Sequence, residues 1–210
     1  MKRLGLVPLF TCEDKSIAAD VIEAAYRGGV RVFEFTNRRS NSFEIFSSMI
    51  KHFEKYNDLI LGIGTILDGQ TAQKFIDAGA HFIISPILKL EMAEVCNRNK
   101  ISWLPGCQTL TEIVTAKENG AEVIKVFPGS VLGPQFVSSI MPVVPDLQLM
   151  ITGGVEPKQE NLAAWFKAGA MCVGMGSGLF TKEIIDTKNW KLLEQRVGDT
   201  LEMIQSIRQK

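Results

Sequence analysis

The sequence predicts an α/β protein, a compact (β/α)8 barrel (TIM barrel) with a C-terminal helix. Short apolar runs rich in Val, Ile and Phe recur eight times, and helical periodicity fills the stretches between them. The connections are short, which indicates parallel strands joined by helical crossovers. The eight runs cover residues 4–10, 30–36, 59–65, 81–86, 102–106, 123–129, 147–154 and 171–177.

Eight strand-helix units favour a barrel over an open sheet. An open doubly wound sheet is the alternative, but no G-x-G-x-x-G follows the first run, where a dinucleotide site would need it. Residues 14–29 predict a helix that ends in a Gly pair, and residues 190–207 predict the terminal helix. With 210 residues, 46% of them hydrophobic, and no break in composition, we expect one domain over 1–210.

Charge and cysteine usage exclude several classes of partner. Lys plus Arg and Asp plus Glu both number 23, without long runs of one sign, so nucleic acid is not an expected partner. No apolar run approaches the roughly 20 residues that span a bilayer, and the N-terminus is a poor signal peptide. We therefore expect a cytoplasmic protein that neither spans nor binds a membrane. The scattered cysteines suit reduced thiols, and the two histidines lie far apart, which argues against a metal site. The cysteines are Cys12, Cys96, Cys107 and Cys172.

Two charged residues stand inside otherwise apolar strand runs. Glu34 lies in the second run and Lys125 in the sixth, "VIKVFPG". Active-site groups of a parallel barrel lie at the carboxyl ends of its strands, and side chains alternate along a strand. If both residues face inward, they enter one pocket from opposite sides of the barrel. The alternative is a structural ion pair, or a lysine that reaches solvent.

A buried lysine has a chemical use. A free lysine, with a pKa of about 10.4, is almost wholly protonated at neutral pH, and only the neutral amine attacks a carbonyl group. Burial disfavours the ammonium form and lowers the pKa, which favours formation of a Schiff base. Lys125 is therefore the candidate nucleophile.

Glycine-bearing loops follow the seventh and eighth runs. Barrel enzymes often bind phosphate at these two loops, through backbone N–H groups. Gly153, Gly154, Gly176 and Ser177 fit this description, although "TGG" by itself could be only a tight turn. Together with a strand lysine, the loops predict a phosphorylated carbonyl substrate.

Five stretches together resemble a known family. They are "GGVRVFEFTNRR", "GIGTILDGQTAQKFIDAGAHFIISP", "LPGCQT", "VIKVFPG" and "ITGGVEP". In this order they resemble the motifs of the 2-keto-3-deoxy-6-phosphogluconate (KDPG) aldolase family, which also includes 4-hydroxy-2-oxoglutarate (KHG) aldolases. The likeness runs from about residue 7 to about residue 178.

The resemblance implies a class I aldolase that needs no metal or cofactor and forms a homotrimer. Its substrate would be a phosphorylated 2-keto-3-deoxy acid, with KDPG as the expected one, cleaved to pyruvate and glyceraldehyde 3-phosphate. The residues implied are Lys125 for the Schiff base, Glu34 as general acid and base, Arg38 and Thr65 for the pyruvate carboxylate, Thr152 near the substrate hydroxyl, and Gly153, Gly154, Gly176 and Ser177 for phosphate.

The sequence departs from the family pattern beside the implied arginine. Thr-Asn-Arg-Arg replaces the family's Thr-Leu-Arg-Thr, so Asn37 and Arg39 flank Arg38 with polar groups, and Phe-Pro-Gly-Ser replaces Phe-Pro-Ala after the lysine. These changes could retune the substrate, or Arg39 could face solvent. Two other functions stay open: a phosphosugar-binding barrel without turnover, and a phosphosugar isomerase, which would leave Lys125 unexplained as a nucleophile.

Overall fold

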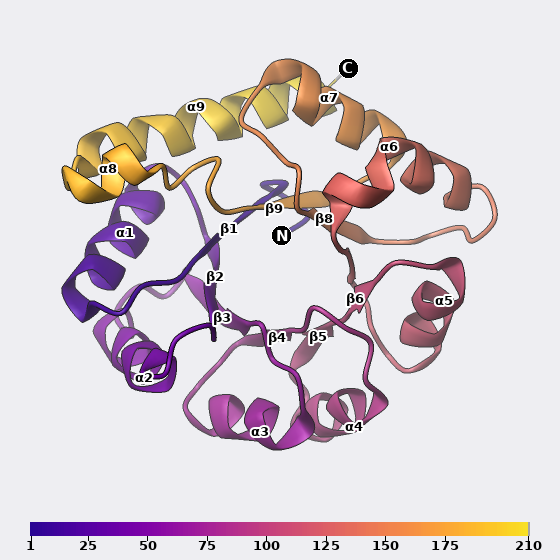
Figure 1. Ribbon diagram of the computed structural model, residues 1–210, viewed down its shortest axis with the longest axis horizontal. Coiled ribbons are helices and arrows are strands. Elements are labelled where there is room, and N and C mark those ends of the chain that lie inside the picture. The colour runs from indigo at the N-terminus through magenta and orange to yellow at the C-terminus, as the bar shows by residue number, and fades with distance from the viewer. Residues whose placement is uncertain (210) are drawn as a thin grey trace.

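The computed structural model describes residues 1–209 as a ring of parallel strands enclosed by helices, which confirms the predicted barrel (Figure 1). The strands are β1 (Leu6–Phe10), β2 (Val32–Thr36), β3 (Ile60–Gly64), β4 (Phe82–Ile84), β5 (Ser102–Leu104), β6 (Gly106–Cys107), β7 (Ile124–Val126), β8 (Leu149–Thr152) and β9 (Cys172–Met175). The helices are α1 (Lys15–Arg27), α2 (Ser42–His52), α3 (Gly69–Asp77), α4 (Leu90–Asn99), α5 (Leu110–Glu118), α6 (Gly129–Ile140), α7 (Gln159–Ala168), α8 (Lys182–Asp186) and α9 (Trp190–Arg208).

The described chain has nine strands where the sequence predicts eight, because the fifth predicted run is split at Pro105. β5 pairs with β4, and β6 pairs with β7, so the two pieces belong to opposite ends of the strand order. Proline has no N–H to donate to a ladder, which interrupts the strand. The carbonyl of Pro105 still accepts a hydrogen bond of 2.9 Å from the N–H of Lys125. The ring therefore closes through Pro105.

The predicted terminal helix is confirmed as α9, which lies in the outer layer of helices and packs against α7 and α1 (Figure 1). Gly28, directly after α1, makes this packing possible, since a Cβ there would lie 2.6 Å from the carbonyl oxygen of Glu194 in α9. Gly29 has a φ of +105°, the left-handed conformation expected of a glycine that ends a helix. The Gly pair thus ends α1 and lets α9 pack closely against it.

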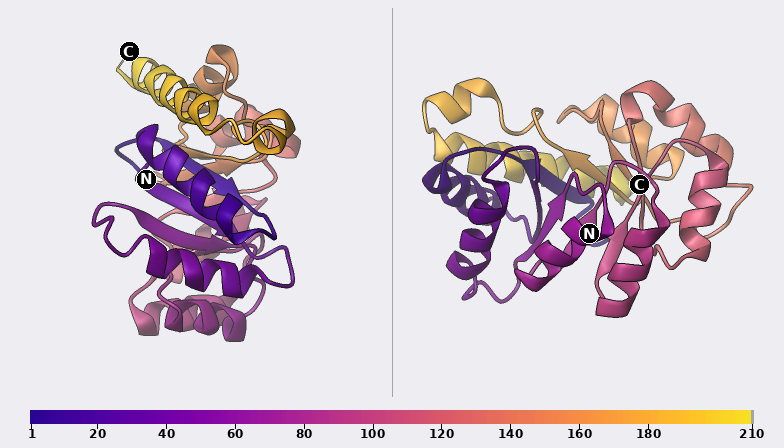
Figure 2. Two further views of the ribbon diagram at one scale, coloured as in Figure 1. Left: turned by 90° about the vertical axis from the view of Figure 1, so that its left-hand side faces the viewer. Right: turned by 60° about the horizontal axis from the view of Figure 1, so that its bottom comes forward.

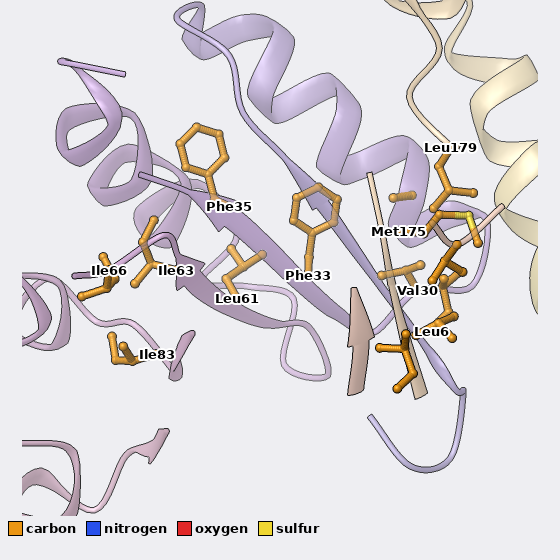
Figure 3. Close-up of a cluster of buried hydrophobic side chains, with 14 of the residues drawn as sticks. Leu6, Val30, Phe33, Phe35, Leu61, Ile63, Ile66, Ile83, Met175 and Leu179 are labelled. Carbon is orange, nitrogen blue, oxygen red and sulfur yellow. The ribbon is translucent and has the colours of Figure 1, made fainter. Parts of the chain in front are cut away.

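Alternating side chains divide the core into two layers. Phe33 and Phe35 of β2 point outward and pack with Leu61 and Ile63 of β3 against the helices (Figure 3). In side view, the helices run alongside the strands on the outside of the barrel (Figure 2). A second layer fills the barrel interior and consists of Val7, Val32, Phe82, Ile84, Leu104, Met150 and Cys172. Within residues 1–209, no helix combines the length and apolar character needed to cross a membrane.

Candidate active site

Lys125 and Glu34 face each other inside the barrel, on the carboxyl side of its apolar interior layer. Lys125 lies at the centre of β7, on the face opposite Ile124 and Val126. Glu34 lies at the centre of β2, on the face opposite the outward-pointing Phe33 and Phe35. The distance from Lys125 Nζ to Glu34 Oε1 is 3.9 Å, and their side chains are only 6% and 1% exposed. The Phe127 ring lies 5.0 Å from Nζ. An amine and a carboxyl group thus face each other in a nearly dry interior.

Burial moves both groups toward their neutral forms. Loss of solvation lowers the pKa of Lys125, with Glu34 opposing this and Arg38 adding to it. Loss of solvation raises the pKa of Glu34, and the charges of Lys125 and Arg38 oppose that shift. A lowered lysine pKa increases the fraction of neutral amine, and a raised glutamate pKa suits a group that both takes and gives protons near neutral pH.

Two glycines make room for the polar side chains of this interior. A Cβ at Gly64 on β3 would overlap Glu34 Oε1, and a Cβ at Gly174 on β9 would overlap Thr152 Oγ1. Each polar side chain therefore leans across the neighbouring strand. Sequence reasoning missed this role of the two glycines, because it depends on the register between strands.

Arg38 and Thr65 lie together on the rim at the carboxyl ends of β2 and β3. Arg38 Nε donates a hydrogen bond of 3.3 Å to Thr65 Oγ1. Arg39 instead forms an exposed ion pair with Glu13, with 3.7 Å between Nη1 and Oε1. The backbone N–H of Asn37 donates to the carbonyl of Gly64 at 2.8 Å. Of the two neighbouring arginines, only Arg38 shares a hydrogen bond with a predicted site residue.

The glycine loops after β8 and β9 have backbone N–H groups without a backbone acceptor. Among the described residues, the N–H groups of Gly153, Gly154 and Ser177 donate to no carbonyl. Gly153 and Gly154 have φ values of +91° and +73°. Gly154 packs on the start of α6, because a Cβ there would lie 2.8 Å from Ser130 Cα. The loops therefore offer free donors to an anion at the carboxyl end of the barrel.

A pocket of about 670 Å³ lies at the opposite end of the barrel. Val32, Phe82 and Leu104 are among its lining residues, together with Lys2 and Lys100. It contains none of the predicted site residues. The groups with chemical potential instead gather at the carboxyl ends of the strands, where parallel barrels carry their active sites.

A parallel barrel with buried, charge-perturbed groups on its strands has the arrangement of a barrel enzyme. Residues 1–196 match the family model described as KDPG and KHG aldolase. The chain belongs to this family of aldolases, which are lyases.

Curated relatives carry aldolase names. The chain is 36% identical over 129 residues to the 2-dehydro-3-deoxy-6-phosphogalactonate aldolase of Escherichia coli, an alignment that covers 60% of this chain and 62% of that protein. It is 28% identical over 199 residues to the 2-dehydro-3-deoxy-phosphogluconate aldolase of Pseudomonas aeruginosa, covering 94% of this chain and 88% of that protein. The second alignment therefore spans nearly the full length of both proteins.

Solved structures of aldolases superpose closely. A native KDPGal structure matches with a TM-score of 0.89 at 25% identity, covering 99% of this chain and 98% of the other. The KDPG aldolase of Legionella pneumophila, captured with pyruvate as a covalent carbinolamine intermediate, matches with a TM-score of 0.84 at 25% identity, covering 92% of each chain. The barrel is thus shared along nearly its whole length.

Proposed function

We propose that this chain is a class I aldolase that forms a Schiff base at Lys125 and cleaves KDPG to pyruvate and glyceraldehyde 3-phosphate. The observation that carries the proposal is the buried pair of Lys125 Nζ and Glu34 Oε1, 3.9 Å apart. A structural ion pair has no need of the Arg38–Thr65 contact and the free backbone donors found at the carboxyl end of the same barrel. A lysine whose pKa is lowered by burial supplies the neutral amine that attack on a ketone requires.

In the proposed reaction, Lys125 attacks the C2 ketone, and loss of water from the carbinolamine gives the iminium ion. Glu34 supplies and removes the protons of these steps, then takes the proton of the C4 hydroxyl group as the C3–C4 bond breaks. The electron pair of that bond moves into the iminium ion and gives an enamine on Lys125, while the aldehyde leaves. Protonation of the enamine at C3, followed by hydrolysis, releases pyruvate and restores the amine.

The proposed substrate lies with its carboxylate on the rim. Arg38 supplies a planar and permanently charged guanidinium group for the carboxylate, and Thr65, which already accepts from Arg38 Nε, adds a hydroxyl. Thr152, whose buried Oγ1 has no hydrogen-bond partner, is proposed to contact the substrate hydroxyl. The proposed phosphate site is the pair of loops that contain Gly153, Gly154, Gly176 and Ser177.

A second substrate deserves a direct comparison, the C4 epimer 2-keto-3-deoxy-6-phosphogalactonate. The Escherichia coli relative that is 36% identical over 129 residues carries that substrate in its name. Both epimers would give the same two products, so the lysine and the carboxylate site cannot separate them. Measurement of kcat/KM for each epimer, and for 4-hydroxy-2-oxoglutarate, decides which substrate this chain prefers.

The Schiff-base mechanism is tested by borohydride trapping with pyruvate, followed by intact-mass measurement and peptide mapping. We expect a stable pyruvate adduct at Lys125 in the wild-type protein and in a Lys55→Ala control, and none in Lys125→Ala. An absence of adduct in the folded wild-type protein at saturating pyruvate would contradict the aldolase proposal. The phosphosugar-binding barrel and the isomerase would then be favoured.

A homotrimer in the cytoplasm is part of the proposal. Apolar side chains on the carboxyl-end loops and the start of α4 are exposed, as an interface between copies would require: Leu67 by 50%, Ile87 by 43% and Leu90 by 44%. Light scattering on the eluting protein gives the molar mass in solution. Replacement of Leu67 by Asp should lower that mass if this surface forms the interface.

A further inference from the structure

Among the described residues, three buried side-chain oxygens inside the barrel have no hydrogen-bond partner: Glu34 Oε2, Thr36 Oγ1 and Thr152 Oγ1. Buried polar atoms are nearly always paired in native proteins, so unpaired atoms of this kind indicate that another molecule binds there. The proposed reaction gives roles to Glu34 and Thr152. It gives none to Thr36.

Thr36 lies beside the carboxyl group of Glu34. The two residues share the inward face of β2, and Thr36 is directly paired with Gly64 on β3. The Glu34 carboxyl group lies over Gly64, because a Cβ at Gly64 would overlap Oε1. The carboxyl group is therefore at the level of the Thr36 side chain. The two side chains form no direct hydrogen bond, since both Thr36 Oγ1 and Glu34 Oε2 are unpaired.

The backbone of Thr36 is held firmly while its hydroxyl stays free. Its carbonyl accepts hydrogen bonds from Thr11 Oγ1 at 3.2 Å, from Ser42 Oγ at 3.4 Å and from the Arg38 N–H at 3.0 Å. Its side chain is buried, with only 1% of the residue exposed. A fixed backbone with a free buried hydroxyl is suited to hold a small molecule in one position.

We propose that Thr36 is a positioning residue for proton transfer, and that its Oγ1 and Glu34 Oε2 together bind the water molecule that carries protons between Glu34 and the substrate. The inference rests on the proposed aldolase function. To form the enamine, the C3 carbon of the pyruvate iminium ion gives a proton to this water, which passes one of its own protons to the Glu34 carboxylate. The reverse transfer protonates the enamine. Water is regenerated in both directions, and Thr36 gains and loses no proton.

The experiment separates proton transfer from Schiff-base formation. Exchange of the pyruvate methyl protons in D2O, followed by NMR, requires both steps. The extent of borohydride trapping after equilibration with pyruvate requires the Schiff base alone. The variants are Thr36→Val, which keeps the shape and removes the hydroxyl, and Thr36→Ser, which keeps the hydroxyl. Thr200→Val removes another buried hydroxyl, one that donates to Arg196 O within α9, and serves as the control.

We expect Thr36→Val to lower the exchange rate by about 10- to 100-fold, less than the roughly 10²- to 10⁴-fold of a complete proton-transfer contribution because Glu34 remains, while the pyruvate concentration for half-maximal trapping stays within about twofold. Thr36→Ser and Thr200→Val should exchange within about threefold of wild type. Exchange by Thr36→Val at the wild-type rate would overturn the inference, as would an equal loss of trapping and exchange. If Thr36→Val does not fold, the comparison of Thr36→Ala with Thr36→Ser decides. If the wild-type protein shows no trapping, the aldolase proposal itself fails.

Discussion

At the amino end of the barrel the interior is filled by apolar side chains such as Val32, Phe82 and Leu104, whereas the carboxyl end holds Lys125 and Glu34. On β2 the two ends are close together, because Val32 and Glu34 lie two positions apart on the same inward face. The apolar side chains help to exclude water from the polar end. This desolvation is the main cause of the pKa shifts of Glu34 and Lys125. Packing at one end thus sets the chemistry at the other.

The largest effect is expected from Lys125→Met, which removes the amine from the polar end of the barrel. We expect aldol cleavage to fall by about 10⁴-fold or more, since the nucleophile is lost. The free energy of unfolding should change little, because burial already raises the pKa of Glu34, and the carboxyl group becomes neutral once the opposing lysine charge is gone. A pyruvate-release assay and urea unfolding measure the two effects. A large loss of stability would mean that the lysine is chiefly structural.

Gly64→Ala tests the space that admits Glu34. The new Cβ would displace the carboxyl group, and a shift of about 1 Å can cost on the order of 10²-fold in rate. We expect kcat to fall by roughly that factor while the fold is kept. Gly198→Ala is the control, because a Cβ there would only come within 3.8 Å of Gly28 O. Equal kcat values in the two variants would refute a positioning role for Gly64.

Val32→Ala addresses the amino end alone. Removal of two buried methyl groups should lower the free energy of unfolding by roughly 2 kcal/mol, while kcat at saturating substrate stays within about twofold. Urea unfolding and steady-state assays at low temperature check the two expectations. A fall in kcat as large as that of Gly64→Ala would show that the two ends cannot be separated.

The smallest expected effect is the shift of the pH profile in Glu34→Gln, which accompanies the slower trapping that loss of the proposed acid and base causes at every pH. Adduct formation requires neutral Lys125, so its rate rises with pH through the pKa of the lysine. The Glu34 charge raises that pKa, and its removal should move the acid limb of the profile to lower pH. Rates of borohydride trapping between pH 5 and 9 report the shift, with the exposed Glu54→Gln as control. A limb that moves to higher pH would contradict the assigned coupling.

The sequence was sufficient for the barrel and for the inward faces of Glu34 and Lys125, because both follow from short-range periodicity and the alternation of side chains along a strand. It was insufficient at Pro105, since a short run such as "SWLPG" has the composition of one strand whether or not the ladder is broken within it. The space at Gly64 and Gly174, and the level of Thr36 beside the Glu34 carboxyl, depend on register between strands. Periodicity within one segment contains no information on that register.

The overlap between a Cβ at Gly64 and the carboxyl group of Glu34 also constrains how this barrel could evolve. A larger residue at 64 becomes acceptable only after the side chain at 34 has shortened, and shortening it first removes the carboxyl group or, in an aspartate, draws it back toward β2. Each single step toward a different chemistry at this corner of the barrel is thus costly, although the double change need not be. In this barrel, the glycine at 64 and the glutamate at 34 therefore depend on each other.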